Sequence, residues 1–149
     1  MIDQPPIEPG TGASPDAPLA TPVEKERLEA VRMALLRMHR LLLDVERARF
    51  EQVRGRIPNN MTFLQIVIND PWFEWLRPMA QLVLLIDERA SDKKVLLTGD
   101  EARGLFDRAR ALLRPDPDGD TFQRLYAQSV QETPALAVLA RQIAEHLDR

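Results

Sequence analysis

The sequence contains no cysteine and only two histidines, which limits the chemistry that it can support. A chain without thiols forms no disulfides, thiolate metal sites or cysteine nucleophiles. A ferritin-like di-iron centre needs Glu-x-x-His pairs, but Leu36 and Ile143 stand three positions before His39 and His146. We therefore expect no cofactor and no histidine-rich metal site, while a carboxylate-only calcium or magnesium site stays open.

An excess of one charge and long apolar runs are also missing. The 20 basic and 23 acidic residues give a formal charge of −3, whereas nucleic-acid-binding domains are usually clearly basic. The longest apolar runs, 82–86 and 135–140, are too short to span a bilayer. The N-terminus has neither the basic start nor the apolar segment of a secretory signal. We expect a cytoplasmic protein that binds neither nucleic acid nor membrane.

Proline is concentrated in residues 1–22, which hold six of the twelve prolines and few large apolar side chains. Such a segment buries too little surface to offset the entropy lost on ordering. We predict a disordered proline-rich tail over 1–22 and a single helical-bundle domain over 23–149. A partner-docking role for the tail is less favoured, because such tails are usually inert.

Apolar residues at helical spacing predict an all-α fold. The longest such pattern, over about 23–54, predicts a first helix whose apolar positions follow one another at steps of three and four. These positions are Leu28, Val31, Leu35, Met38, Leu42 and Val45. Arg49 interrupts the pattern before Phe50 and Val53 resume it, and Gly55 supplies the stop.

Five further helices are predicted from caps and periodicity, giving a bundle of four longer and two shorter helices. A short buried helix over 63–68 is preferred to a lone strand, with Thr62 and Gln65 at capping-box spacing. A helix from Pro71 to about Ala90 contains Pro78, where a kink or restart is expected. The last three helices are expected to begin at these caps: Thr98, Asp118 or Asp120, and Thr133.

Aromatic residues are scarce, and three of the eight fall within 70–78, including both tryptophans. Asp70 can cap a helix there, and Pro71 suits its first position. In an α-helix one seam would contain five apolar residues, which are Trp72, Trp75, Met79, Leu82 and Ile86. We predict that this seam faces the centre of the fold, against the first helix.

The sequence offers one candidate ligand-binding site, formed by His39, Trp72, Trp75 and Arg77. The two indoles could line a pocket for an apolar or planar ligand, and Arg77 could close it or pair with Glu74. His39 has only apolar helical neighbours, so an orienting carboxylate would have to come from another helix. Aromatic residues at helical spacing are more often core, and no catalytic or metal-ligating residue is assigned.

Two charged patterns invite ligand interpretations that the sequence does not favour. An EF-hand loop starting at Asp116 would need glycine where Thr121 stands, so a turn followed by a helix cap is preferred. Arg40, Arg47 and Arg54 recur on one face of the first helix. Acidic residues interleave with them, so a solvated face is preferred to a strip that binds anions or nucleic acid.

The aromatic stretch also carries a resemblance to known proteins. The residues that carry it are His39-Arg40-Leu41-Leu42, Glu46-Arg47, Gly55, the segment 70–78 and Ile86-Asp87. Over roughly 28–115 the chain resembles a small family of all-helical bacterial proteins with no established activity. The resemblance implies a helical domain of bacterial origin and brings no catalytic residues with it.

The missing catalytic arrangements favour a non-enzymatic protein that acts through protein–protein contacts or self-association, for example as a homodimer. Several apolar residues widen the apolar surface of two helices beyond a single seam, and an interface could use them. They are Leu36, Leu41, Leu43, Leu76 and Val83. The alternative is a small ligand-binding or enzymatic bundle with a site near His39 and Trp72.

Overall fold

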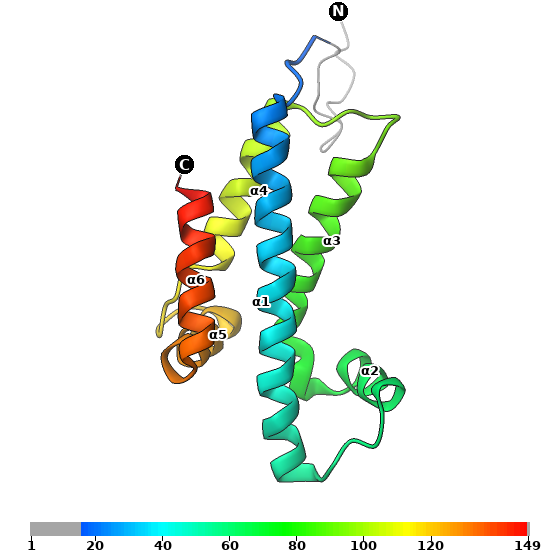
Figure 1. Cartoon of the computed structure of the whole chain (residues 1–149), viewed down its shortest axis with the longest axis vertical. Helices are drawn as coiled ribbons and strands as arrows, with labels where there is room; N and C mark the ends of the chain where they lie inside the picture. The colour runs from blue at the N-terminus through cyan, green and yellow to red at the C-terminus, as the bar shows by residue number, and fades with distance from the viewer. Residues whose placement is uncertain (1–15, 149) are drawn as a thin grey trace, which may run out of the picture.

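The computed structural model describes residues 16–148, which form an all-α fold, as predicted (Figure 1). Six α-helices and one 3₁₀ helix follow one another, and the only strand-like pairing in this range is a single β-bridge. In order, the elements are α1 (Pro22–Arg54), α2 (Asn60–Asn69), η1 (Pro71–Leu76), α3 (Arg77–Ser91), α4 (Gly99–Leu112), α5 (Thr121–Glu132) and α6 (Pro134–Leu147). None of the helices in residues 16–148 has both the length and the apolar character that crossing a membrane requires.

Helix α1 is the element against which most of the chain packs. It contacts α3, α4, α6 and η1 along its length (Figure 1). Its predicted seam is buried from Leu28 to Leu42 and then moves on by one residue, so that Glu46 is buried instead of Val45. Phe50 is buried as predicted, whereas Val53 is exposed. This shift is the drift of a straight helix against a seven-residue repeat. Gly55 ends the helix with a φ of 97°, in the left-handed region that favours glycine.

The restart predicted at Pro78 is confirmed, because a new helix begins beside it at Arg77, but the α-helix predicted over 71–76 is wrong. Residues 71–76 form the 3₁₀ helix η1, and α3 starts at Arg77, so Pro78 lies in a first turn where its missing N–H is harmless. With three residues per turn, the buried residues of η1 are Phe73 and Leu76, which lead on to Met79. Trp72 and Trp75, predicted on the buried seam, are only half-buried.

The predicted caps at Asp70, Thr98 and Asp120 are confirmed, whereas those at Thr133 and Thr62 differ from the structure. Thr98 and Glu101 form the predicted capping box, and of the two candidate aspartates it is Asp120 that caps α5. Helix α6 begins after Thr133, although the threonine side chain makes no capping bond. The predicted Thr62–Gln65 box is wrong, because the Asn59 side chain accepts the Thr62 N–H at 2.8 Å.

The predicted tail over 1–22 extends too far into the folded part. Residues 1–15 lie outside the described residues, so the prediction for them stays a prediction. Leu19 pairs with Thr98 in the β-bridge, the Ala20 N–H donates to the Leu97 carbonyl at 2.9 Å, and Ala20 is buried. The chain is therefore held against the α3–α4 connection before α1 begins.

Candidate functional site

The structure brings together two of the four residues predicted to bind a ligand. Trp72 and Trp75 line the same surface cavity, which lies between η1 and the start of α5. Arg77 points elsewhere, since its guanidinium donates to the Ile68 carbonyl at 2.9 Å. His39 is half-buried on α1 and does not line this cavity. The structure therefore places His39 outside the cavity that the two tryptophans line, although the sequence predicted one site for all three.

The tryptophan cavity, as we name it, has a volume of about 580 Å³. Its lining residues are Pro71, Trp72, Glu74, Trp75, Pro78, Asp120, Thr121, Phe122 and Leu125. The Trp75 and Phe122 rings pack at a centroid distance of 5.7 Å, and Phe122 in turn stacks on Tyr126 at 5.6 Å. Because Phe122 and Tyr126 are buried, the inner wall of the cavity is anchored in the core of the fold.

Trp72 is fixed by residues of α1 that do not line the cavity. Its indole N–H donates to Glu46 Oε2 at 2.8 Å. Phe50 meets the ring edge-on at a centroid distance of 5.4 Å, and the Arg54 guanidinium lies 5.6 Å from the ring centroid. These contacts set the orientation of Trp72 from outside the cavity, so the indole presents a defined surface to it.

Sequence reasoning missed Glu46, which is 5% exposed and joins three elements through one polar network. Its Oε1 accepts a hydrogen bond from Arg49 at 3.1 Å, and Arg49 also pairs with Glu132 of α5 at 2.5 Å. The network thus links α1, η1 and α5 through residues of which only Trp72 lines the cavity. The sequence feature that could have revealed this network is Arg49. It interrupts an apolar seam, and its guanidinium pairs with the carboxylates of Glu46 and Glu132.

The charged groups at the cavity are both acidic. Glu74 has a 63% exposed side chain and lies 3.7 Å from Arg77, an ion pair that water screens. Asp120 caps α5 by accepting the Gln123 N–H at 2.8 Å. This bond uses the carboxylate to satisfy the helix N-terminus, which is therefore not offered to an external anion.

His39 has a lowered pKa because burial penalises its charged form. Among the described residues it has no hydrogen-bond partner, so no carboxylate orients its imidazole as a general base requires. Its position among apolar neighbours fits a histidine at the edge of the core.

The lowered pKa of His39 predicts acid sensitivity of the fold. Below about pH 6.5 the unfolded chain takes up a proton more readily than the folded one, so stability falls as the pH falls from there toward the folded pKa. The loss is limited to about 1.4 kcal/mol per pH unit. The test is to measure the free energy of unfolding by urea titration at about pH 7.5 and about pH 5.5. We expect the difference between the two pH values to be smaller for His39→Leu than for the wild type. His146→Gln, the control, should retain it, and an equal loss in both variants would contradict the assignment.

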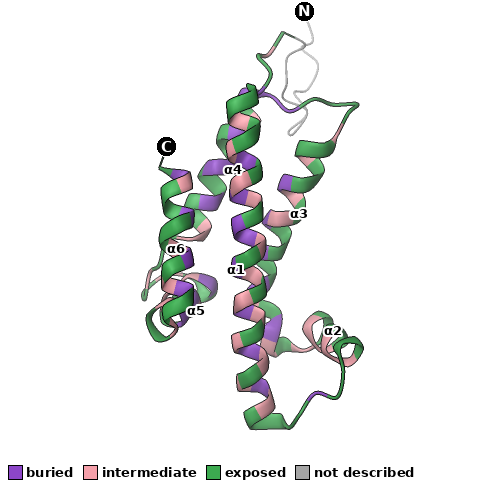
Figure 2. Ribbon diagram, viewed as in Figure 1, coloured by how far each residue is buried: buried purple, intermediate pink, exposed green. Residues whose placement is uncertain are grey.

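Helix α2 is apolar on both faces and carries no charged residue, but none of its residues is buried (Figure 2). The prediction of a buried helix here is therefore right for the helix and wrong for its burial. On the inner face Phe63, Ile66 and Val67 pack against the core, and Phe63 meets Phe73 edge-on at 5.7 Å. The α2 outer face, as we name it, consists of Met61, Leu64 and Ile68, which are 66%, 54% and 55% exposed.

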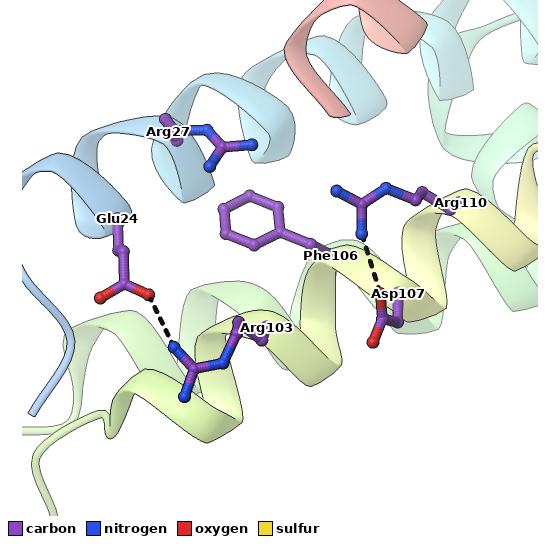
Figure 3. Close-up of a pocket in the computed structure, with 6 residues that line it drawn as sticks. All are labelled: Glu24, Arg27, Arg103, Phe106, Asp107 and Arg110. Atoms are coloured by element: carbon purple, nitrogen blue, oxygen red, sulfur yellow. Dashed lines mark hydrogen bonds and ion pairs between the residues drawn. The ribbon is translucent and has the colours of Figure 1, made fainter. Parts of the chain in front are cut away.

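A second cavity, of about 320 Å³, lies between α1 and α4 near the end of α6 (Figure 3). Arg27 lies over the Phe106 ring at 4.8 Å, and Arg27 and Arg110 donate to the carbonyls of His146 and Leu147. His146, which lies beside these contacts, is half-buried. The arginines cap the C-terminus of α6, where cations are favoured.

The other charges of this second cavity are largely paired among themselves. Arg103 lies 3.5 Å from Glu24 and also contacts Asp100, and Arg110 lies 2.8 Å from Asp107 (Figure 3). Arg27 Nε is buried without a partner among the described residues, and its guanidinium is stabilised by Phe106 instead. This arrangement closes the end of α6 and presents no clear excess of one charge.

No protein-family model, curated protein or solved structure matches the sequence. The bacterial resemblance of residues 28–115 stays a prediction. Within residues 16–148, no group of three or more histidine, aspartate or glutamate side chains is placed to hold a metal ion.

Proposed function

We propose that this helical-bundle protein acts through protein–protein contacts and that the α2 outer face is its contact surface. The observation that carries the proposal is a helix with apolar side chains on both faces and no charge. An uncharged helix with apolar side chains on two faces normally has both faces covered. In this chain only the inner face of α2 is covered, so a partner is needed to cover the other.

The apolar residues from which the sequence suggested an interface are largely used within the chain. Leu76 is buried, and Leu41, Leu43 and Val83 pack against the core. They therefore contribute to folding and leave little surface for a partner. The case for an interface rests on α2 instead.

A second copy of the chain is the partner that the charge pattern favours. In a two-fold interface the same surface meets itself, so charges on it would face like charges. Helix α2 has none, and its polar residues are the neutral Asn60, Thr62, Gln65 and Asn69. A helix that lies on a membrane surface usually carries lysine or arginine on its polar face, and a charged partner would need opposite charges on α2.

The size of the α2 outer face predicts weak association. Three side chains of a ten-residue helix cover less than the roughly 800 Å² per partner of a standard stable interface. We therefore expect a reversible dimer with a dissociation constant on the order of micromolar.

Charged substitutions on α2 test this proposal. Leu64→Glu should abolish dimer formation in sedimentation velocity over a concentration series, because it places like charges at the centre of the interface. The matched control is Leu84→Glu, since Leu84 is a similarly exposed leucine, at 57%, on α3. Both variants should keep the wild-type circular dichroism, as both residues face solvent.

Two results would overturn the proposal. One is a wild-type protein that stays monomeric up to the highest concentration reached. The other is a dimer that Leu64→Glu and Leu84→Glu weaken to the same extent, which would place the interface elsewhere or make it non-specific.

A further inference from the structure

We propose that the tryptophan cavity binds a small organic cation, specifically an alkylated ammonium group carried on a compact apolar body. The inference is independent of the α2 outer face, because the residues that line the cavity come from 71–78 and 120–125. It goes beyond the predicted apolar or planar ligand by assigning the charge of the ligand.

Aromatic rings form the recognition surface of the cavity. Trp72, Trp75 and Phe122 line it together with Pro71 and Pro78. A cation over an aromatic face is attracted by the ring quadrupole, most strongly by tryptophan. Desolvated alkylated ammonium ions suit such a surface, since their methyl groups also contact the rings directly.

The two indoles differ in what already covers them. Trp72 has the Arg54 guanidinium 5.6 Å from its ring centroid and its N–H bonded to Glu46. Within residues 16–148 no cation lies over the Trp75 ring, and its indole N–H has no hydrogen-bond partner. Trp75 is therefore the ring that an incoming cation would contact first. The Arg54–Trp72 contact shows the same chemistry on the neighbouring indole.

The charge of the residues that line the cavity favours a positively charged ligand. Glu74 and Asp120 are the charged residues of the lining, and both are acidic. Asp120 already caps the N-terminus of α5 with its carboxylate. The positive end of this helix is therefore not free to attract an anion. Arg77 lies 3.7 Å from Glu74, but both side chains are more than half exposed, which weakens the pair. An anionic ligand would meet two carboxylates, whereas a cation is attracted by both.

The volume of the cavity favours a small molecule. At about 580 Å³ it falls within the roughly 300–1,000 Å³ of typical small-molecule sites. The buried Phe122 fixes its inner wall, and Glu46 fixes Trp72 through its indole N–H. A site with fixed walls binds without a large ordering cost.

Choline and its neutral carbon analogue 3,3-dimethylbutan-1-ol form the test pair, because they differ mainly in charge. Trp72 and Trp75 are the only tryptophans of the chain, so intrinsic fluorescence reports directly on the cavity. We expect saturable quenching or a spectral shift with choline, at a dissociation constant about tenfold lower than that of the alcohol. Equal responses to the two probes, or no response to either, would overturn the proposal.

Two conservative variants locate the effect. Glu74→Gln combined with Asp120→Asn should reduce the preference for choline to the part that the aromatic rings supply, since both carboxylates are lost while asparagine still caps α5. Glu88→Gln, an exposed site on α3 outside the cavity, should retain it. An undiminished preference in the double variant, with wild-type circular dichroism, would contradict the assignment. Leu64→Glu should leave choline binding unchanged, which separates this inference from the α2 proposal.

Discussion

Replacing Glu46 with alanine is expected to lower the free energy of unfolding by about 2–4 kcal/mol. The change leaves the Trp72 indole N–H without its acceptor and removes one of the two carboxylates that hold Arg49. Since Glu46 is 5% exposed, water can replace the lost carboxylate only in part. Urea denaturation at a fixed protein concentration measures the loss.

Two further variants separate the hydrogen bond from the charge at position 46. Glu46→Gln keeps an acceptor for the Trp72 N–H, so it should lose less than half as much stability as Glu46→Ala. Asp44→Ala, at an exposed site on the same helix, should change stability by less than about 0.5 kcal/mol. An alanine variant at position 46 as stable as the control would show that the network does not stabilise the fold.

Replacing Phe73 with alanine is expected to lower stability by about 3–4 kcal/mol. Phe73 is 1% exposed and lies 5.7 Å from both Phe50 and Phe63, centroid to centroid, so its loss leaves a cavity between α1, α2 and η1. Trp75→Ala should cost about 1–2 kcal/mol, because the larger ring is only half-buried.

The order of these two losses tests the 3₁₀ geometry of η1. An α-helix over 71–76 would bury Trp72 and Trp75 on the seam with Met79, and Trp75→Ala would then be the more damaging change. Urea denaturation of both variants decides between the two geometries. A loss at Trp75 equal to or larger than that at Phe73 would contradict the structure.

The sequence predicted those features of the fold that depend on local periodicity and caps. The seam from Leu28 to Leu42, the capping box at Thr98 and the stop at Gly55 each need only a few neighbouring residues. The 3₁₀ helix was not predictable in this way. Its residues suit an α-helix equally well, and the contacts of Phe73 with Phe50 and Phe63 select the tighter winding.

The candidate site was predicted only where its residues are close in the sequence. Trp72 and Trp75 were identified by the concentration of aromatic residues, and the structure places them at one cavity. Phe122 and Asp120 reach the same cavity from α5 through tertiary packing, which no spacing pattern reveals. Glu46 was missed because a glutamate beside an apolar seam usually faces solvent, whereas here Trp72 and Arg49 hold it inside.

Helix α2 shows the limit of inferring burial from composition. Its apolar run correctly predicted a helix, but composition cannot say whether the chain supplies enough surface to cover both faces. The structure covers one face through Phe63, Ile66 and Val67 and leaves the other exposed. The proposed function follows from this difference.

Crosslinking through a single introduced cysteine tests the proposed α2 interface most directly, because the natural chain has no cysteine to interfere. Leu64 lies between Met61 and Ile68 on the α2 outer face, so a two-fold axis would bring its two copies close together. Leu64→Cys treated with a short bis-maleimide should give a covalent dimer rapidly, and Leu84→Cys should not. Equal crosslinking at the two positions, or none at position 64, would contradict self-association through α2.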